Sequence, residues 1–338
     1  MTNYLKLDIQ MFATPIQPNI TAGTGNAHGY TTAEVGTKAN FGKLLEPGLR
    51  KIFFESYDEI PEQFPKVYNV QSSTKARETD WGMGAFGDWT KRASQVDEVS
   101  YKQLKPGLER TYTHEAFTQG FMVTREMYDD DQYRQFEKLP KAMARAGRAK
   151  VEKDAAGLFK TGFTANGYDG KPLFSNAHPL LGGGTNSNIV VGALSDVTLK
   201  EAIKLMRETK DEAGNLIQLK PSKLIVPPAL HDTAVRLLGS DQIAGGTLND
   251  TNKFLNGFGI EIVVLDYLGA AAGGSDTAWF LQDGSNHELT FFWRTKPEFK
   301  WDEDFDTFVA KYRGYMRYRL GYSDFRGIVG SLGTAPAA

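Results

Sequence analysis

The apolar residues that follow Asp129–Asp131 constrain this fold more than any other feature, because they recur mostly at steps of three and four over about 30 residues. They are Tyr133, Phe136, Leu139, Met143, Ala146, Val151, Ala155 and Leu158. The acidic start and the basic residues further along suit the dipole of an α-helix. At about 1.5 Å per residue, this helix would be on the order of 45 Å long. It needs a sheet or a second helix beside it along much of that length, and Pro140 either kinks it or marks a boundary.

A second helix is predicted just upstream, over residues 46–60. Its helical spacing is carried by Leu49, Ile52, Phe53 and Tyr57. Pro47 is expected near the first turn, where the missing N–H of a proline costs little. Pro61 closes the segment. The two helices together predict a helical layer beside a sheet.

Residues 1–45 differ from the rest of the chain, because they are rich in Gly, Thr, Asn and Ala and contain few large apolar residues after Phe12. Such a segment cannot bury enough surface to fold alone, so we expect an extended arm that becomes ordered only on another surface. The first residues do not resemble a secretory signal, because Lys6, Asp8 and Gln10 interrupt the apolar residues. No stretch of about 20 apolar residues is present to span a membrane.

Residues 66–122 have the composition of β-strands, being dense in Gly, Trp, Tyr, Thr and Phe. Two such stretches flank a charged, polar middle at Lys91–Glu98. This arrangement predicts a long β-hairpin with a polar tip. Two strands alone have no core to bury, so we expect the hairpin to lie on another surface.

The second half of the chain alternates between helix and strand signals and then becomes mostly β. Thr198 and Glu201 form a candidate capping box for a helix. Further helix and strand signals lie at 224–226 (strand), 230–239 (helix ending at Gly239) and 257–268 (strand). The closing strands are expected at 277–281, 288–293, 299–308 and 311–322, with a turn at 283–286. The fold class is therefore α+β.

Composition excludes several kinds of function. The formal net charge is only −2, and no basic run is present, so strong direct binding of a nucleic-acid backbone is not expected. The absence of cysteine excludes disulfides, thiol catalysis and cysteine zinc sites.

The stretch DGKPLFSNAHP, residues 169–179, contains the residue types of a hydrolytic site. A serine hydrolase using Ser175 and His178 is therefore one hypothesis. Ser175 lacks the Gly-x-Ser-x-Gly turn that exposes a nucleophile, and Pro179 favours an extended His178. The alternative is structural: Asp169-Gly170 makes a turn, Leu173 and Phe174 fill a core, and His178 bonds to the backbone. We favour the structural alternative and predict no catalytic residue.

Metal and cofactor sites are not predicted either. No two of the five histidines stand four residues apart, and His114-Glu115 fails as a zinc motif because position 118 is Thr118. Gly82, Gly84 and Gly87 match Gly-x-Gly-x-x-Gly, but the helix that a dinucleotide site requires does not follow them. We therefore predict no metal ion and no cofactor.

Several stretches, in their order along the chain, resemble tailed-bacteriophage major capsid proteins of the Hong Kong 97 type. LDIQMFA (7–13) is similar to the start of many phage structural proteins. DGKPLFSNAHP, followed by a glycine loop and Asn188, resembles a stretch of Mu-like major head subunits. KLIVPPALHDTAVRLLGS (223–240) and RYRLGYSDFRGIVGS (317–331) resemble two further stretches of that group. The likeness spans about 45–332.

The resemblance implies a Hong Kong 97-type fold with a defined division of the chain. It assigns 1–45 to an N-terminal arm and 72–120 to an extended loop that overlaps a neighbour. Residues 46–71 and 121–184 would form the peripheral domain with its spine helix. Residues 185–275 would form the axial domain, and 276–338 would return to the peripheral domain.

The resemblance also implies a function: hexamers and pentamers of this chain would build an icosahedral head shell. The shell would form in the bacterial host cytoplasm and enclose double-stranded DNA without reading its sequence. A portal, and separate scaffolding and decoration proteins, are the implied partners. Some relatives form lysine–asparagine crosslinks, but nothing identifies partners for Lys91 or Lys102, so we predict none. An encapsulin-like compartment or a tail protein with the same fold remains an alternative.

Overall fold

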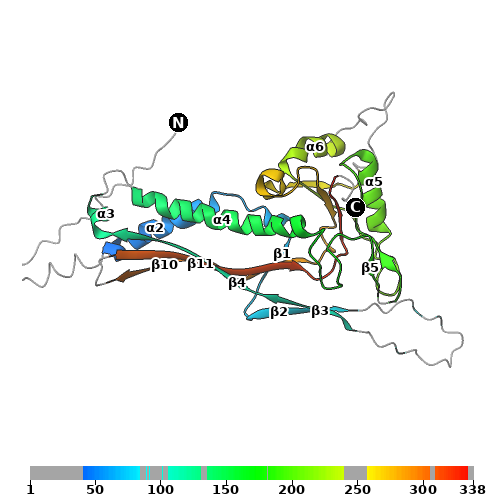
Figure 1. Cartoon of the computed structure of the whole chain (residues 1–338), viewed down its shortest axis with the longest axis horizontal. Coiled ribbons are helices and arrows are strands. Elements are labelled where there is room, and N and C mark those ends of the chain that lie inside the picture. Colours follow the sequence, from blue (N-terminus) through cyan, green and yellow to red (C-terminus); the bar gives the residue numbers. More distant parts are fainter. Residues whose placement is uncertain are drawn as a thin grey trace, which may run out of the picture. The chain divides into compact units, whose positions relative to one another are not determined.

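The computed structural model of the chain (Figure 1) describes residues 41–83, 106–130, 135–180, 182–239, 257–304 and 309–333, and the single residues 89, 91 and 101. Of the arm expected at 1–45, residues 1–40 lie outside the described residues. Nearly all described residues belong to one unit, Gly42–Ala338. Within them, no helix combines the length and the apolar character that a bilayer crossing requires.

The predicted long helix is confirmed as α4 (Gln135–Thr161), with 27 residues. Pro140 lies inside α4, so it does not mark a helix boundary. The upstream helix is also confirmed, as α2 (Phe41–Asp58), but it begins earlier than expected. Pro47 is therefore inside α2 and not in its first turn. The prediction of an extended arm is wrong for residues 41–45, because they are helical. Leu45 and Leu49 are four residues apart, so the apolar spacing continues upstream of the proline.

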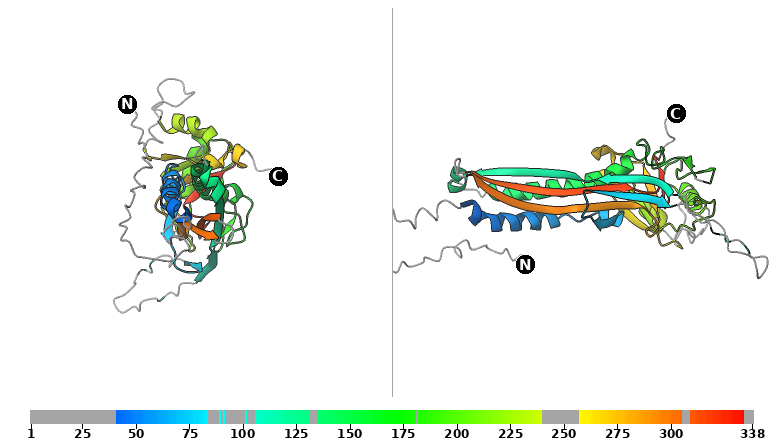
Figure 2. Two further views of the ribbon diagram at one scale, coloured as in Figure 1. Left: turned by 90° about the vertical axis from the view of Figure 1, so that its left-hand side faces the viewer. Right: turned by 90° about the horizontal axis from the view of Figure 1, so that it is seen from below.

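The helices lie on a four-stranded sheet with the order β1-β10-β11-β4. Its strands are β1 (Asn69–Ser72), β10 (Leu289–Asp304), β11 (Val309–Tyr322) and β4 (Glu115–Thr124). β10 and β11 are antiparallel, as are β11 and β4, whereas β1 runs parallel to β10. Viewed from below, β4 follows one long side of this sheet and α2 the other (Figure 2). Along β11, Tyr312, Met316 and Tyr318 are buried on the face toward the helices.

The predicted hairpin is confirmed at its base, where β2 (Arg77–Met83) pairs antiparallel with β3 (Pro106–Thr113). Its expected extent over 66–122 was wrong, because β1 and β4, at the two ends of that range, pair with β10 and β11 of the main sheet. These two strands form a sheet separate from the main one. Tyr112 attaches the hairpin to the body: its side chain is 2% exposed and its hydroxyl lies 2.8 Å from Ser323 Oγ. The predicted polar tip lies outside the described residues, apart from Lys91.

A second four-stranded sheet has the order β12-β9-β7-β8. Its strands are β7 (Lys223–Val226), β8 (Glu261–Val264), β9 (Trp279–Gln282) and β12 (Ile328–Ser331). The helices α5 (Asp196–Arg207) and α6 (His231–Gly239) accompany it. The capping-box prediction was wrong in its residues. Helix α5 begins one turn earlier, with Ser195 as its N-cap and Thr198 as the reciprocal partner, because the Ser195 hydroxyl accepts a hydrogen bond from Thr198 N.

This second sheet lies between two hydrophobic clusters, and alternate residues of its strands enter one or the other. In β7, Ile225 packs with residues of α4 and the main sheet, whereas Leu224 and Val226 pack with α5 and α6. β9 and β12 are on either side of β10 and β11 in sequence but belong to this second sheet. The division expected at 275/276 therefore does not coincide with a sheet boundary.

The remaining described elements are short. They are α3 (Arg125–Asp129), β5 (His178–Pro179), β6 (Thr185–Asn186), and the 3-10 helices η2 (Phe64–Lys66), η3 (Pro228–Leu230), η4 (Asp266–Leu268) and η5 (Ala270–Ala272).

Candidate functional site

The segment that follows α4, residues 169–179, begins with the predicted turn. Gly170 has a φ of 75°, which favours glycine, and Lys171 N donates to Asp169 Oδ1 over 3.0 Å. Leu173 and Phe174 are 0% and 2% exposed. The turn and the two core residues are therefore as predicted.

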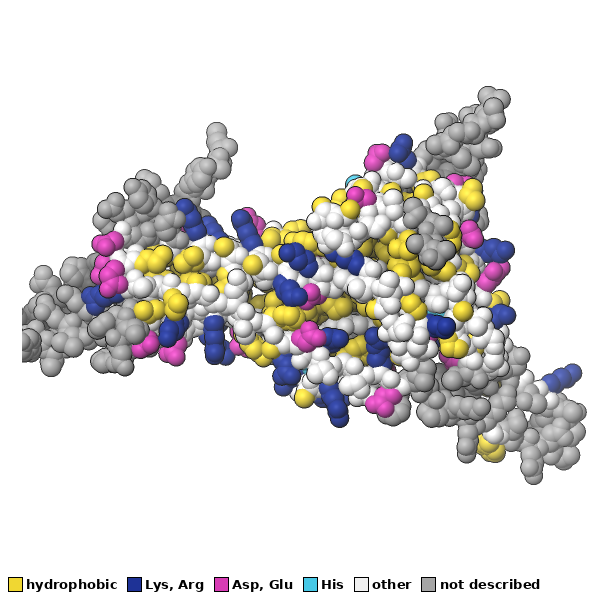
Figure 3. Space-filling view, in the orientation of Figure 1, with side chains coloured by type: hydrophobic (Ala, Val, Ile, Leu, Met, Phe, Trp, Pro, Cys, Tyr) yellow, Lys and Arg dark blue, Asp and Glu magenta, His cyan; other side chains and the backbone are white. Residues whose placement is uncertain are grey.

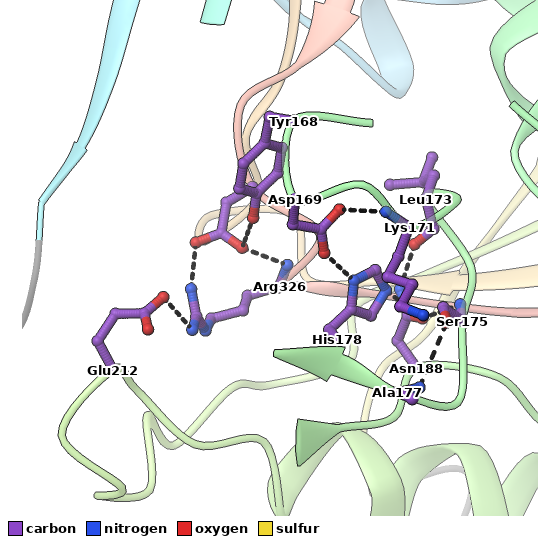
Figure 4. Close-up of polar contacts among 11 residues, drawn as sticks. Tyr168, Asp169, Lys171, Leu173, Ser175, Ala177, His178, Asn188, Glu212 and Arg326 are labelled. Carbon is purple, nitrogen blue, oxygen red and sulfur yellow. Dashed lines mark hydrogen bonds and ion pairs between the residues drawn. The ribbon is translucent and has the colours of Figure 1, made fainter. Parts of the chain in front are cut away.

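His178 is held by side chains and not by the backbone, so that part of the prediction was wrong. Its Nδ1 lies 2.6 Å from Asp169 Oδ2, and its Nε2 lies 3.2 Å from Asn188 Oδ1 (Figure 4). The imidazole also stacks on Phe325. The side chains of His178 and Asp169 are only 1% and 4% exposed. Burial favours these side-chain partners, because a charged carboxylate away from water needs a nearby donor.

Asn188 fixes the orientation of this group. Its Nδ2 donates to Leu173 O over 2.7 Å, and its Oδ1 accepts from Ser175 N over 2.8 Å. The atom that faces His178 is thus the amide oxygen. The backbone of Asn188 forms two further hydrogen bonds: its N–H donates to Ser175 O, and its carbonyl accepts from Gly330 N of β12. Asn188 therefore joins residues 169–179 to the strand β12.

The hydrolase hypothesis requires His178 to take a proton from Ser175, and the geometry does not provide this. Both ring nitrogens of His178 already face oxygen atoms of Asp169 and Asn188. The Ser175 hydroxyl instead accepts from Ala177 N over 3.3 Å, as in a tight turn. Asp169, His178 and Ser175 are close in space but are not connected as a catalytic triad.

A second polar cluster adjoins the first, and sequence reasoning did not identify it. The Arg326 guanidinium donates to Asp324 Oδ2 over 2.6 Å and to Glu212 Oε1 over 2.7 Å (Figure 4). It also donates to Lys210 O over 3.0 Å. Tyr168 donates to the same Asp324 carboxylate. No local motif could have indicated this cluster, because Glu212 and Arg326 are 114 residues apart.

The remaining histidines occupy separate places. His114 stands between β3 and β4, with Nε2 3.1 Å from Ser73 Oγ, and burial followed by the charge of Arg317 lowers its pKa. His287 accepts a hydrogen bond from Leu289 N. His28 lies outside the described residues. Among the residues that the structure places, no group of three or more His, Asp or Glu side chains could hold a metal ion.

The two clusters have the chemistry of a structural junction. They tie the segment after α4, the loop near Glu212 and the chain between β11 and β12 together through buried and partly buried polar groups that interact with one another. Such networks rigidify a fold and position the elements that they connect.

Comparison with known proteins identifies the class of protein that has this architecture. The described fold is similar to the bacteriophage JBD30 capsid (TM-score 0.51, 18% identity, 62% of this chain and 92% of that chain). It is also similar to the asymmetric unit of the bacteriophage PhiM1 mature capsid (TM-score 0.54, 13% identity, 82% and 89%). The architecture is thus the α+β phage capsid fold of the Hong Kong 97 type, as predicted.

The sequence gives the family itself. Residues 108–331 match the family described as "Phage capsid protein". The major capsid protein of Escherichia phage Mu is 22% identical, with 67% of this chain and 97% of that protein covered. This chain belongs to the phage capsid protein family. It is a structural component of the virion capsid and not an enzyme, as the sequence predicted.

Proposed function

We propose that this chain is the major capsid protein of a tailed phage or prophage, and that its copies assemble into the icosahedral head shell. The observation that carries the proposal is the family match over residues 108–331, which includes α4, the strands β4, β10 and β11, and the whole second sheet. The likeness to the Mu major capsid protein over nearly its whole length supports the same role.

The domain roles implied by the sequence resemblance form part of this proposal. In it, α4 is the spine helix of a peripheral domain made from 46–71 and 121–184. Residues 72–120, whose base is the β2–β3 hairpin, form the extended loop. Residues 185–275 form the axial domain, with β9 and β12 from the C-terminal range completing its sheet. Residues 276–338 otherwise return to the peripheral sheet as β10 and β11.

The proposed partners follow from the shell. Hexamers and pentamers of the chain would form its wall, with a portal at one vertex and separate scaffolding and decoration proteins assisting. Double-stranded DNA would be enclosed without sequence-specific contacts. A formal charge of −2 supports this role, because a strongly basic wall would bind the phosphate backbone and hinder its movement.

Electron microscopy of the purified full chain, expressed alone and with candidate scaffolding proteins, tests the proposal. We expect closed shells of uniform size. In a second variant, a short Gly-Ser linker replaces residues 84–105 between β2 and β3. This variant should keep its circular dichroism spectrum but form no shells, whereas Lys171→Ala, on an exposed loop, should assemble normally. Normal shells from the linker variant would refute the role of the hairpin. DNA-free particles loaded with a host enzyme would favour the encapsulin-like alternative.

A further inference from the structure

The face of the main sheet that points away from α2 and α4 is rich in cations. Along β11, alternate residues lie on this face, and they are Lys311, Arg313, Tyr315, Arg317 and Arg319. Four of these five are cationic, although the formal net charge of the whole chain is −2. The base of the β2–β3 hairpin passes beneath this face, and Lys and Arg side chains gather around it (Figures 1 and 3). Such a concentration of positive charge attracts anions.

Several of these cations already have a carboxylate partner. The pairs are Lys311–Asp304, Arg319–Glu115 and, from β10, Lys300–Glu298. Arg317 of β11 and Arg294 of β10 differ, because neither forms a hydrogen bond or an ion pair within the described part of the chain. Both side chains are half-buried, so water replaces a missing partner only in part.

An irregularity of the sheet places Arg294 beside Arg317. The register between β10 and β11 shifts between Trp293, which is opposite Tyr318, and Thr295, which is opposite Arg317. A β-bulge of this kind leaves an extra residue and redirects its side chain. The Nε of Arg294 is buried and has no hydrogen-bond partner among the described residues. A buried cationic donor without a partner indicates that an acceptor is missing from this place.

His114 adds a third basic group at the same place. Its ring meets the ring of Phe292 edge-on, with the centroids 6.4 Å apart, and Phe292 is opposite Arg319 on the cationic face. His114 is only 5% exposed. The Ser73 hydroxyl gives its one hydrogen to Glu78, so it can only accept from His114 Nε2. The other ring nitrogen, Nδ1, is buried and has no partner among the described residues, so it is available to a ligand.

The charges around His114 are mostly positive. Burial is the main cause of its lowered pKa, followed by the charge of Arg317, with Glu78 opposing and Arg294 reinforcing the effect. Glu78 is the carboxylate that acts on the imidazole, and it is already bound by Ser73 Oγ and Lys75 Nζ. The two arginines therefore have no carboxylate to neutralise them here.

We propose that Arg294, Arg317 and His114 bind a tetrahedral oxyanion of the phosphate or sulfate type, in the angle between the main sheet and the hairpin base. The two guanidinium groups donate to its oxygens. The imidazole takes up a proton from the solvent at Nδ1 and donates it to a third oxygen. A tetrahedral anion offers four oxygens to donors that approach from three elements, whereas a carboxylate offers two. The inference goes beyond the proposed function, because the site lies within one subunit and does not depend on shell formation.

Titration of the purified full chain with sodium sulfate, at an ionic strength held constant with sodium chloride, tests the proposal. Sulfate stays fully ionised near neutral pH, so only the protein titrates. Calorimetry should show an affinity that rises as the pH falls from about 8 to 6, because binding takes up a proton. In NMR spectra the ring signal of His114, identified by its absence in His114→Gln, should move to the imidazolium position when sulfate is added. The ring signal of His287 should stay in place.

Three variants identify the groups that bind. Arg317→Gln and Arg294→Gln should each weaken sulfate binding by about tenfold, because each removes a charge-assisted hydrogen bond. His114→Gln can still donate to Ser73, but the affinity should no longer depend on pH. The matched control is Arg313→Gln, which removes a cation from the same face of β11. It should change the affinity by less than about twofold, because salt screens a charge that does not contact the anion.

Several results would overturn the proposal. One is a folded chain, verified by circular dichroism, that binds neither sulfate nor phosphate. Another is an equal loss of affinity for Arg313→Gln and Arg317→Gln, which would indicate attraction to the whole face and no defined site. A shift of the His114 signal by acetate as large as that by sulfate would refute the tetrahedral class of ligand. Electron microscopy of shells is a separate measurement, so a failure of the proposed function leaves the outcome of the titration unaffected.

Discussion

The imidazole of His178 lies flat on the ring of Phe325, with the ring centroids 3.7 Å apart and the planes inclined by 4°. This contact joins the segment after α4 to the chain between β11 and β12. Asp169 and Asn188 hold the same imidazole by its two nitrogens. Residues with the chemistry of a hydrolytic site therefore connect two segments of a capsid subunit that are distant in sequence.

Replacing His178 with alanine should lower the free energy of unfolding by about 3–5 kcal/mol, because the buried Asp169 carboxylate loses its partner. Chemical denaturation of the unassembled chain measures the change. Lys171→Ala provides the control, since its side chain is exposed in the same loop and the change should stay within about 0.5 kcal/mol. A loss for His178→Ala no larger than that of the control would show that the junction is not stabilised by this group.

Arg148 and Arg145, both in α4, should respond differently to substitution by lysine. The Arg148 side chain is 2% exposed, donates to Tyr57 O, and stacks over the Tyr57 ring with Cζ 3.9 Å from its centroid. Lysine cannot reproduce that planar geometry, so Arg148→Lys should lower the free energy of unfolding by about 1–3 kcal/mol. Arg145 forms an exposed pair with Glu59, so Arg145→Lys should change stability by less than about 0.5 kcal/mol. Equal melting temperatures for the two variants would contradict this assignment.

The helices could be predicted because their information is local. The three- and four-residue spacing that ends at Leu158 is sufficient to identify α4, and a proline within it did not stop the helix. The start of α5 was misplaced by one turn because Ser195 and Thr198 can both cap a helix, and only the packing of the first turn selects Ser195. Local signals therefore give the type of element more reliably than its first residue.

The partition into two sheets could not be predicted. The turn at 283–286 is present, with Asp283 Oδ1 accepting from Ser285 N and Asn286 N. However, the strands that it joins, β9 and β10, do not pair with each other. β9 pairs with β7 and β12, which are both distant in sequence, whereas β10 pairs with the next strand, β11, and with the distant β1. The partners of His178 were missed for a similar reason: Phe325 and Asn188 are not neighbours of His178 in sequence. A polar segment alone does not indicate which distant groups it will meet.

Gly321 should tolerate no side chain, because an added Cβ would lie 2.4 Å from Cε1 of Tyr112, the residue that attaches the hairpin to the body. We expect Gly321→Ala to destabilise the chain by about 1–3 kcal/mol and to increase hydrogen exchange in β3. Gly157→Ala, in α4, is the matched control. Outside its chain neighbours and the backbone of its own helix, no atom lies within 4 Å of its added Cβ, so Gly157→Ala should instead stabilise the chain by about 0.5–1 kcal/mol. If Gly321→Ala leaves the stability unchanged, the hairpin can move away freely from β11.

Acid should destabilise the unassembled subunit through His287. Burial, reinforced by the charge of Lys223 and opposed by that of Asp283, lowers the pKa of His287 from 6.5 to about 4. The unfolded chain therefore binds this proton at a higher pH than the folded chain does. The associated stability is complete above pH 6.5 and is lost progressively as the pH falls toward 4. Thermal unfolding measured across this range should show the decline.

His287→Gln should be less stable at neutral pH, because Leu289 N loses the acceptor that His287 Nδ1 provides. Its stability should nevertheless fall less steeply between pH 6.5 and 4 than that of the unmodified chain. The lowered pKa of His114 acts in the same direction, so a double variant that also carries His114→Gln should give the flattest profile. If the single variant loses stability with acid as steeply as the unmodified chain, then His287 is not the group that titrates. Because the prediction concerns the slope with pH, it can be tested even where the substitution lowers stability overall.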